Sequence, residues 1–245
     1  MNSKDEILNE IDGRNGYIVF NIGLNDLEII NKIVNLQYTF FLTQFYPHMV
    51  EKIKKTSINH YHTLGIEGHK DIWTKERRTL FESEIDTFKN ISFIKNLKKY
   101  FIDLAITNED STRSEEIYWR LVRPNQKDDI GPLHADSWFW DLQNGPIKKG
   151  FRRIKIWISL HNEQGVSGFK LIPGSHLKNY EFKGEFRDGK MKPIVDDFLE
   201  NDRNAIIVPT KSGDAILFHD NLIHGGSFGK EQTRVSIEFT MLVRA

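Results

Sequence analysis

The stretch RIKIWISL at residues 153–160 decides the fold, because it places an aliphatic side chain at every second position. Side chains alternate between the two faces of a β-strand, so this spacing predicts a strand with one aliphatic face. The aliphatic face consists of Ile154, Ile156, Ile158 and Leu160. The opposite face consists of Arg153, Lys155, Trp157 and Ser159. We therefore expect a sheet that packs against helices on one side and encloses Trp157 on the other.

The same period recurs in the second half of the chain, after a first half with mostly helical spacing. We expect helices at 5–11 and from Asn25 or Asp26, as N-cap, to about residue 44, with a strand at 17–22 between them. The later strands are predicted at 117–123, 132–140, 154–160, 169–172, 205–209, 215–218 and 234–243. Helices followed by many strands indicate an α+β fold, in which the strands form a sandwich or jelly roll and the helices pack outside.

The length of the chain favours a single domain. We expect one domain over residues 1–245, with a helical N-terminal part at 1–114 and a jelly-roll core at 115–245. The stretch 177–204 is charged and contains two glycines, which predicts a long loop. A long loop inside a compact domain is usually functional or mobile.

Composition excludes several classes of protein. The formal net charge is +0, and basic residues form only small clusters, so the surface expected of a nucleic-acid-binding protein is not evident. The chain contains no cysteine, so a bound metal must use His, Asp or Glu. The first residues lack the apolar core of a signal peptide, and no apolar run approaches the ~20 residues that span a bilayer. We expect a cytoplasmic protein without membrane contacts.

Two short stretches, PLHADSW at 132–138 and LIHGG at 222–226, offer metal ligands. On a strand, His134 and Asp136 project from the same face because they are two residues apart. With His224 they would form the set of two imidazoles and one carboxylate that holds non-haem Fe(II) and leaves coordination positions open. A His-x-Asp pair alone is more often a surface pair, and His219 competes with His224 for the third position.

Arg234 and Ser236 are a candidate anion site, because they share one face of the last predicted strand. The guanidinium fork of an arginine matches a carboxylate with two hydrogen bonds, and the serine hydroxyl can add a third. This pair is suited to hold one end of a dicarboxylate. An ordinary surface arginine on an edge strand is the alternative.

These motifs together resemble the phytanoyl-CoA dioxygenase family of Fe(II)/2-oxoglutarate oxygenases. The resemblance covers roughly residues 115 to 243 and rests on HAD at 134–136, IPGSH at 172–176, GDAILF at 213–218, LIHGG at 222–226 and RVS at 234–236. It implies a double-stranded β-helix with His134, Asp136 and His224 as the catalytic iron ligands. It also implies that Arg234, Ser236 and Trp157 bind the cosubstrate 2-oxoglutarate.

The resemblance further implies an enzyme that uses O2 to hydroxylate a C–H bond of a small-molecule metabolite, with release of succinate and CO2. In related halogenases a small residue replaces the iron-binding carboxylate, so Asp136 favours hydroxylation. Desaturation or cyclisation would use the same residues. The alternative function is that of a cupin-type enzyme or binding protein that does not use 2-oxoglutarate, for which the Arg234–Ser236 pair would have no purpose.

Other residues complete the expected site. If Trp157 faces the barrel interior, Lys155 does too, and we expect it to face an anionic group of 2-oxoglutarate or substrate; a lysine in water at the open rim is the alternative. Trp138 and Trp140 follow the His-x-Asp pair and are candidates to wall the substrate pocket, with core packing as the alternative. Trp73, Arg77 and Arg78 are candidates for the mouth of the pocket. His60 and His62 have the spacing of metal ligands, but a surface or substrate-pocket role is favoured over a second metal site. The substrate and the oligomeric state stay open.

Overall fold

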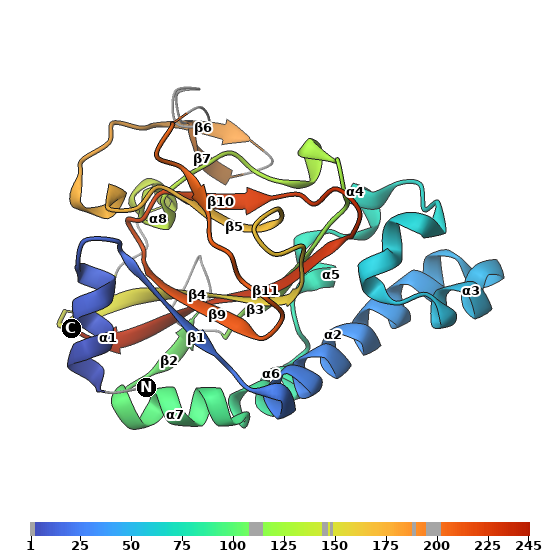
Figure 1. The fold of residues 1–245 in the computed structure, drawn as a ribbon, viewed down its shortest axis with the longest axis horizontal. Helices are drawn as coiled ribbons and strands as arrows, with labels where there is room; N and C mark the ends of the chain where they lie inside the picture. The colour runs from blue at the N-terminus through green and yellow to red at the C-terminus, as the bar shows by residue number, and fades with distance from the viewer. Residues whose placement is uncertain (1–2, 108–114, 144–146, 148, 188–189, 195–201) are drawn as a thin grey trace.

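The computed structural model describes residues 3–107, 115–143, 147, 149–187, 190–194 and 202–245. Figure 1 shows a large sheet with helices on its outer side and a smaller sheet facing its other side. The helices are α1 (Lys4–Asp12), α2 (Leu24–Phe45), α3 (Val50–Lys55), α4 (His69–Ile72), α5 (Lys75–Arg78), α6 (Glu82–Lys89), α7 (Ser92–Tyr100) and α8 (Asp136–Gln143). Short 3-10 helices are η1 (Pro47–Met49), η2 (Ile58–Leu64), η3 (Lys127–Asp129) and η4 (Ser175–Leu177).

The strands form three antiparallel sheets. Their bounds are β1 (Tyr17–Asn21), β2 (Ala105–Thr107), β3 (Ile117–Val122), β4 (Phe151–His161), β5 (Gly168–Leu171), β6 (Lys183–Arg187), β7 (Lys190–Ile194), β8 (Ile206–Ile207), β9 (Asp214–His219), β10 (His224–Ser227) and β11 (Arg234–Arg244). The large sheet has the order β1-β9-β4-β11-β2, and β3 also pairs with β11. The smaller sheet is β10-β5-β8, and β6 and β7 form a hairpin. The predicted α+β fold with a jelly-roll core is confirmed.

The side chains of β4 alternate between two buried environments, as predicted. Its aliphatic face is fully buried in a core shared with α2, α6 and α7, including Ile30, Val34, Phe88 and Leu97. Trp157, from the opposite face, packs between the two sheets with Phe169 and Phe218. Burial of aliphatic side chains such as these stabilises the fold by about 1.5–3 kcal/mol per side chain.

The cap at Asp26 and the segment 132–140 depart from the prediction. Asp26 was expected as a possible cap of its own helix, but its carboxylate accepts hydrogen bonds from the backbone N–H groups of Ser92 and Phe93, at 3.0 and 2.6 Å, and so caps α7. The strand predicted at 132–140 is wrong beyond His134, because α8 begins at Asp136. The period of two in its tryptophans is also compatible with a short helix whose aromatic side chains bury on different neighbours.

The predicted loop at 177–204 is partly a β-hairpin, β6–β7, in the residues that the structure describes. Residues 188–189 and 195–201 of that stretch lie outside the described residues. Strands β2 and β10 were not predicted as such, because the first is only three residues long and the second contains two glycines. In the described part of the chain, no helix is both long and apolar enough to cross a membrane.

Candidate metal centre and cosubstrate site

The backbone brings His134 and His224 together. They form an isolated antiparallel bridge, in which His134 N donates to His224 O at 2.9 Å and His224 N donates to His134 O at 2.8 Å. Beyond this bridge the chain turns, and Asp136 becomes the first residue of α8. The N–H of Ser137 donates to Asp220 O at 3.1 Å, which holds the start of α8 against the segment that follows β9. The His-x-Asp pair therefore converges through a turn rather than through an extended strand.

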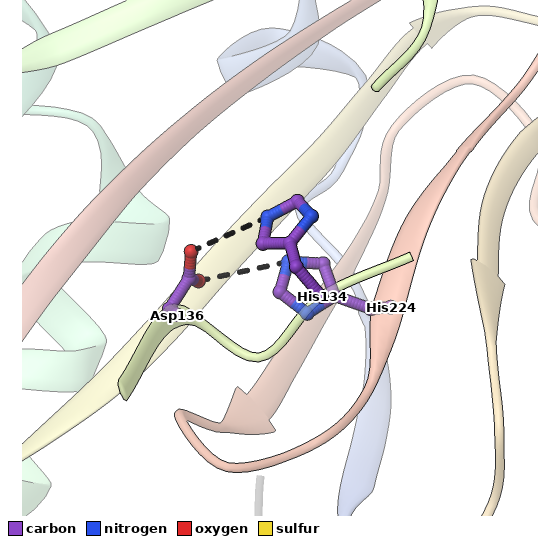
Figure 2. Close-up of side chains that lie close together, drawn as sticks. All are labelled: His134, Asp136 and His224. Carbon is purple, nitrogen blue, oxygen red and sulfur yellow. Dashed lines mark ion pairs between the residues drawn. The ribbon is translucent and has the colours of Figure 1, made fainter. Parts of the chain in front are cut away.

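The three side chains converge on one point, as Figure 2 shows. Asp136 Oδ1 lies 3.7 Å from His134 Nε2, and Asp136 Oδ2 lies 3.6 Å from His224 Nε2. One ligand atom from each residue lies within 4.8 Å of the other two. A search of the described residues for three or more His, Asp or Glu side chains with the spacing of a metal site finds this group alone. Two imidazole nitrogens and one carboxylate oxygen suit Fe(II).

Hydrogen bonds fix both imidazoles in the orientation that metal binding requires. His134 Nδ1 lies 2.8 Å from Pro132 O, and His224 Nδ1 lies 2.9 Å from Leu222 O. A carbonyl oxygen only accepts, so each Nδ1 carries the proton and each Nε2 presents its lone pair. Metal-binding histidines commonly use this second hydrogen bond to set their tautomer.

Aromatic packing keeps His224 neutral and in place. Its ring stacks on Phe169 at a centroid distance of 5.2 Å and meets the edge of Phe218 at 4.6 Å. Burial lowers the pKa of His224 to about 4, against the opposing effect of Asp136. A neutral imidazole is the form that binds a metal ion.

Lys155 is buried, with 2% of its side chain exposed, so the alternative of a lysine in water at the rim is wrong. Its Nζ lies 3.3 Å from Asp136 Oδ2 and 5.7 Å from the centroid of the Trp140 ring. The anionic group beside it in the structure is thus the carboxylate of the metal site. Its expected contact with 2-oxoglutarate or substrate stays a prediction.

Arg234 and Ser236 lie on the inner face of β11, buried in the same region. Arg234 is 2% exposed, and its Nη1 donates to Gly168 O at 2.8 Å. Arg234 Nε and Ser236 Oγ are buried and have no hydrogen-bond partner in the described part of the chain. Unsatisfied buried polar atoms are costly, so this pair fits a polar ligand that supplies acceptors.

The glycines after His224 make room for this arrangement. A Cβ on Gly226 would lie 2.8 Å from Arg234 Nη2, and a Cβ on Gly225 would lie 3.0 Å from Leu133 Cδ2. Burial lowers the pKa of Arg234 to about 10, with Arg120 acting in the same direction and Glu238 in the opposite one. The guanidinium is therefore charged at neutral pH, although no carboxylate among the described residues lies within ion-pair distance of it.

A cavity of about 610 Å³ lies at this site, and neither Lys155 nor Ser236 belongs to its lining. Its lining includes the three residues of the metal site, Arg234, Trp157 and Trp140. Trp138 is not part of this lining, because α8 turns its indole onto Phe182, where the two rings stack at 5.1 Å. Phe139, Arg120 and Glu238 also line the cavity, although their sequence pattern did not identify them as site residues. Glu238 shares the β11 face of Arg234 and Ser236, so the period of two was a signal for it.

The remaining sequence candidates divide between the cavity and other places. Arg78 lines the cavity, whereas Arg77 and Trp73 do not belong to its lining. His60 and His62 lie in the 3-10 helix η2, and His62 Nδ1 lies 3.0 Å from Thr233 Oγ1. His219 Nδ1 pairs with Asp220 Oδ1 at 3.1 Å, away from the triad.

Comparison with solved structures shows the fold. AviO1 from Streptomyces viridochromogenes Tue57 aligns with a TM-score of 0.55 and 14% identity over 98% of this chain and 95% of that chain. EctD from S. alaskensis, solved with bound Fe, aligns with a TM-score of 0.56 and 14% identity over 98% and 77% of the two chains. ThoJ, described as a non-heme monooxygenase, aligns with a TM-score of 0.53 and 10% identity over 94% and 75%.

Comparison of the sequence identifies the family. A search of curated proteins finds no match. The family model described as phytanoyl-CoA dioxygenase (PhyH) matches residues 49–228, which is most of the chain and includes His134, Asp136 and His224. With this match and the His-Asp-His site, the chain belongs to the phytanoyl-CoA dioxygenase family of non-haem Fe(II)- and 2-oxoglutarate-dependent oxygenases.

Proposed function

We propose that the protein hydroxylates a C–H bond of a small-molecule metabolite, with release of succinate and CO2. One observation carries this proposal: a His-Asp-His group with metal-site spacing shares a cavity with a buried arginine, Arg234, that has no carboxylate partner among the described residues. The first element fits an iron ion, and the second fits the distal carboxylate of 2-oxoglutarate. Other metal enzymes on similar barrels need no such arginine.

His134, Asp136 and His224 are the proposed iron ligands, and the same three residues are the proposed catalytic centre. Their donor set leaves positions on iron for cosubstrate and O2. Asp136 supplies the carboxylate that the related halogenases lack, which supports hydroxylation as the outcome. When bound, iron and 2-oxoglutarate supply the oxidising chemistry, and the protein supplies binding, orientation and exclusion of water.

Arg234 and Ser236 are the proposed binding site of 2-oxoglutarate. The family match ends at residue 228, so the support for this pair comes from its geometry. Arg234 Nε and Ser236 Oγ are two buried polar atoms that lack partners in the described chain, on the same strand face. A carboxylate would accept from both. Trp157 lines the cavity beside them, and we propose it as a wall of the cosubstrate pocket.

The substrate is proposed to occupy the outer part of the cavity, beside Phe139 and Trp140. A volume of about 610 Å³ lies within the usual range of roughly 300–1,000 Å³ for small-molecule sites. We also propose that residues 1–245 form one domain, because β1 near the N-terminus joins the same sheet as β11. The cluster of buried hydrophobic residues outside the large sheet includes side chains from both ends of the chain, among them Ile7 and Val243.

The test is an anaerobic absorbance titration with Fe(II) and 2-oxoglutarate. We expect a weak charge-transfer band that requires both additions, is lost in Asp136→Ala and requires much more 2-oxoglutarate in Arg234→Ala. Arg244→Ala is the matched control, because Arg244 is on the same strand but its side chain is 69% exposed. Iron binding without the band would favour a cupin-type enzyme that does not use 2-oxoglutarate. Normal product formation by Asp136→Ala would refute the ligand assignment.

A further inference from the structure

Arg78, at the end of α5, lines the cavity, and the described residues provide no counter-ion for its guanidinium. Its Nε donates to Trp73 O and its Nη1 donates to Trp119 O, both at 2.9 Å. Nη2 has no partner in the described part of the chain, and no carboxylate there lies within 4.0 Å of the group. The two carbonyls thus fix the plane of the guanidinium, and Arg78 lines the cavity.

The acidic residues around Arg78 are engaged elsewhere or too distant. Glu238 forms an ion pair with Arg120, and Asp129 pairs with Arg123 at 2.8 Å. Glu76, on the same short helix, is exposed, and no ion pair joins it to Arg78. Burial and the charge of Arg120 lower the pKa of Arg78 to about 10, so its charge persists at neutral pH but is poorly compensated.

The neighbouring Arg77 shows what a purely structural arginine looks like on the same helix. Its Nη1 also donates to two backbone carbonyls, Asp71 O at 2.6 Å and Ile72 O at 3.1 Å. Its guanidinium lies over the ring of Phe45, 4.6 Å from the centroid, and it is not part of the cavity lining. Support of loop carbonyls therefore does not require the position that Arg78 occupies in the cavity.

We propose that the substrate carries an oxyanion, a carboxylate or a phosphate, that Arg78 binds. This inference rests on the proposed function, in which 2-oxoglutarate occupies Arg234, whereas Arg78 lines the same cavity without a carboxylate within ion-pair distance among the described residues. A guanidinium fork binds either oxyanion through charge-assisted hydrogen bonds. Tyr118 and Trp140, which also line the cavity, provide aromatic surface for the remainder of the molecule.

The experiment measures binding of three probes to protein loaded with Zn(II) and saturating 2-oxoglutarate. The probes are phenylacetate, phenyl phosphate and the neutral phenylacetamide. Their binding is measured by isothermal titration calorimetry. We expect at least one anionic probe to bind at least tenfold more tightly than the amide, and the tighter anion identifies the group. Arg78→Gln should abolish the preference, and Arg77→Gln should keep it.

Several results would overturn the inference. These are equal binding of acids and amide by the wild-type protein, no binding of either anion, or an unchanged preference in a folded Arg78→Gln variant. If circular dichroism shows that this variant is unfolded, Arg78→Lys, which keeps the charge, replaces it and should weaken the preference.

The absorbance titration tests the proposed function without substrate, so a charge-transfer band with no anion preference refutes the Arg78 assignment alone. Absence of the band with the preference retained refutes the proposed function alone.

Discussion

Substitution of Gly226 by alanine should weaken 2-oxoglutarate binding and spare the metal site. The new Cβ would lie 2.8 Å from Arg234 Nη2, 3.1 Å from Nη1 and 3.3 Å from Cζ, and ordinary contact begins near 3.4 Å. The guanidinium must therefore shift by about 0.6 Å (3.4 − 2.8). Because Nη1 is held by Gly168 O at 2.8 Å, the rigid plane cannot move without losing alignment. Misalignment of one charge-assisted hydrogen bond costs about 1.5–3 kcal/mol, or roughly 10- to 150-fold in affinity.

The assay is an anaerobic titration of Fe(II)-loaded protein with 2-oxoglutarate, followed by charge-transfer absorbance. Gly131→Ala is the matched control, because Gly131 lines the same cavity and a Cβ there meets no heavy atom within 4 Å. We expect unchanged Fe(II) affinity in both variants and a weakened 2-oxoglutarate affinity only in Gly226→Ala. An unchanged 2-oxoglutarate affinity in folded Gly226→Ala, or an equal loss in the control, would refute the assignment of Arg234.

Two further predictions concern buried charges. Lys155→Met removes the ammonium 3.3 Å from Asp136 Oδ2, so urea unfolding should show a loss of roughly 3–5 kcal/mol in EDTA and a smaller loss with Zn(II), which replaces the missing positive charge. Equal losses in both conditions would contradict this. Burial lowers the pKa of His69 from 6.5 to about 4, so the unfolded chain binds more protons between these values and stability falls as pH falls through that window. In EDTA, His69→Gln should flatten this dependence by up to about 3 kcal/mol, and an unchanged slope would exclude His69 as its source.

The faces of the large sheet follow from the sequence because strand alternation is a local property. In β4 and β11 the aliphatic positions predict the side that packs on helices, and the remaining positions place Lys155, Trp157 and Arg234 toward the interior. The candidate metal ligands could also be predicted from the sequence, because two short motifs and their order along the chain identify them. Their convergence needed a tertiary contact that periodicity does not encode.

The failures have a common physical cause in tertiary contacts. In α8, tryptophans at alternate positions imitate a strand, but the hydrogen bond from Ser137 N to Asp220 O fixes the start of a helix. Asp26 has the residue type and the position expected of a cap for the helix that follows it. It instead caps a helix that begins 66 residues later (92 − 26 = 66). The sequence suggested only that Arg78 could lie near a pocket mouth. That no described carboxylate pairs with it depends on tertiary contacts, since Glu238 and Asp129 pair with Arg120 and Arg123.

With His134, Asp136 and His224 as the proposed ligands, the backbone bridge between His134 and His224 would make iron binding a late step of synthesis and folding. The two residues are 90 positions apart (224 − 134), and no local segment holds both of them near Asp136. At a synthesis rate of roughly 5–20 residues per second, His224 leaves the ribosome several seconds after Asp136. A nascent chain at that stage offers an imidazole and a carboxylate but no complete site. At the proposed site, tight metal binding would therefore require that both sheets have assembled, and iron would be retained only by chains that have finished folding.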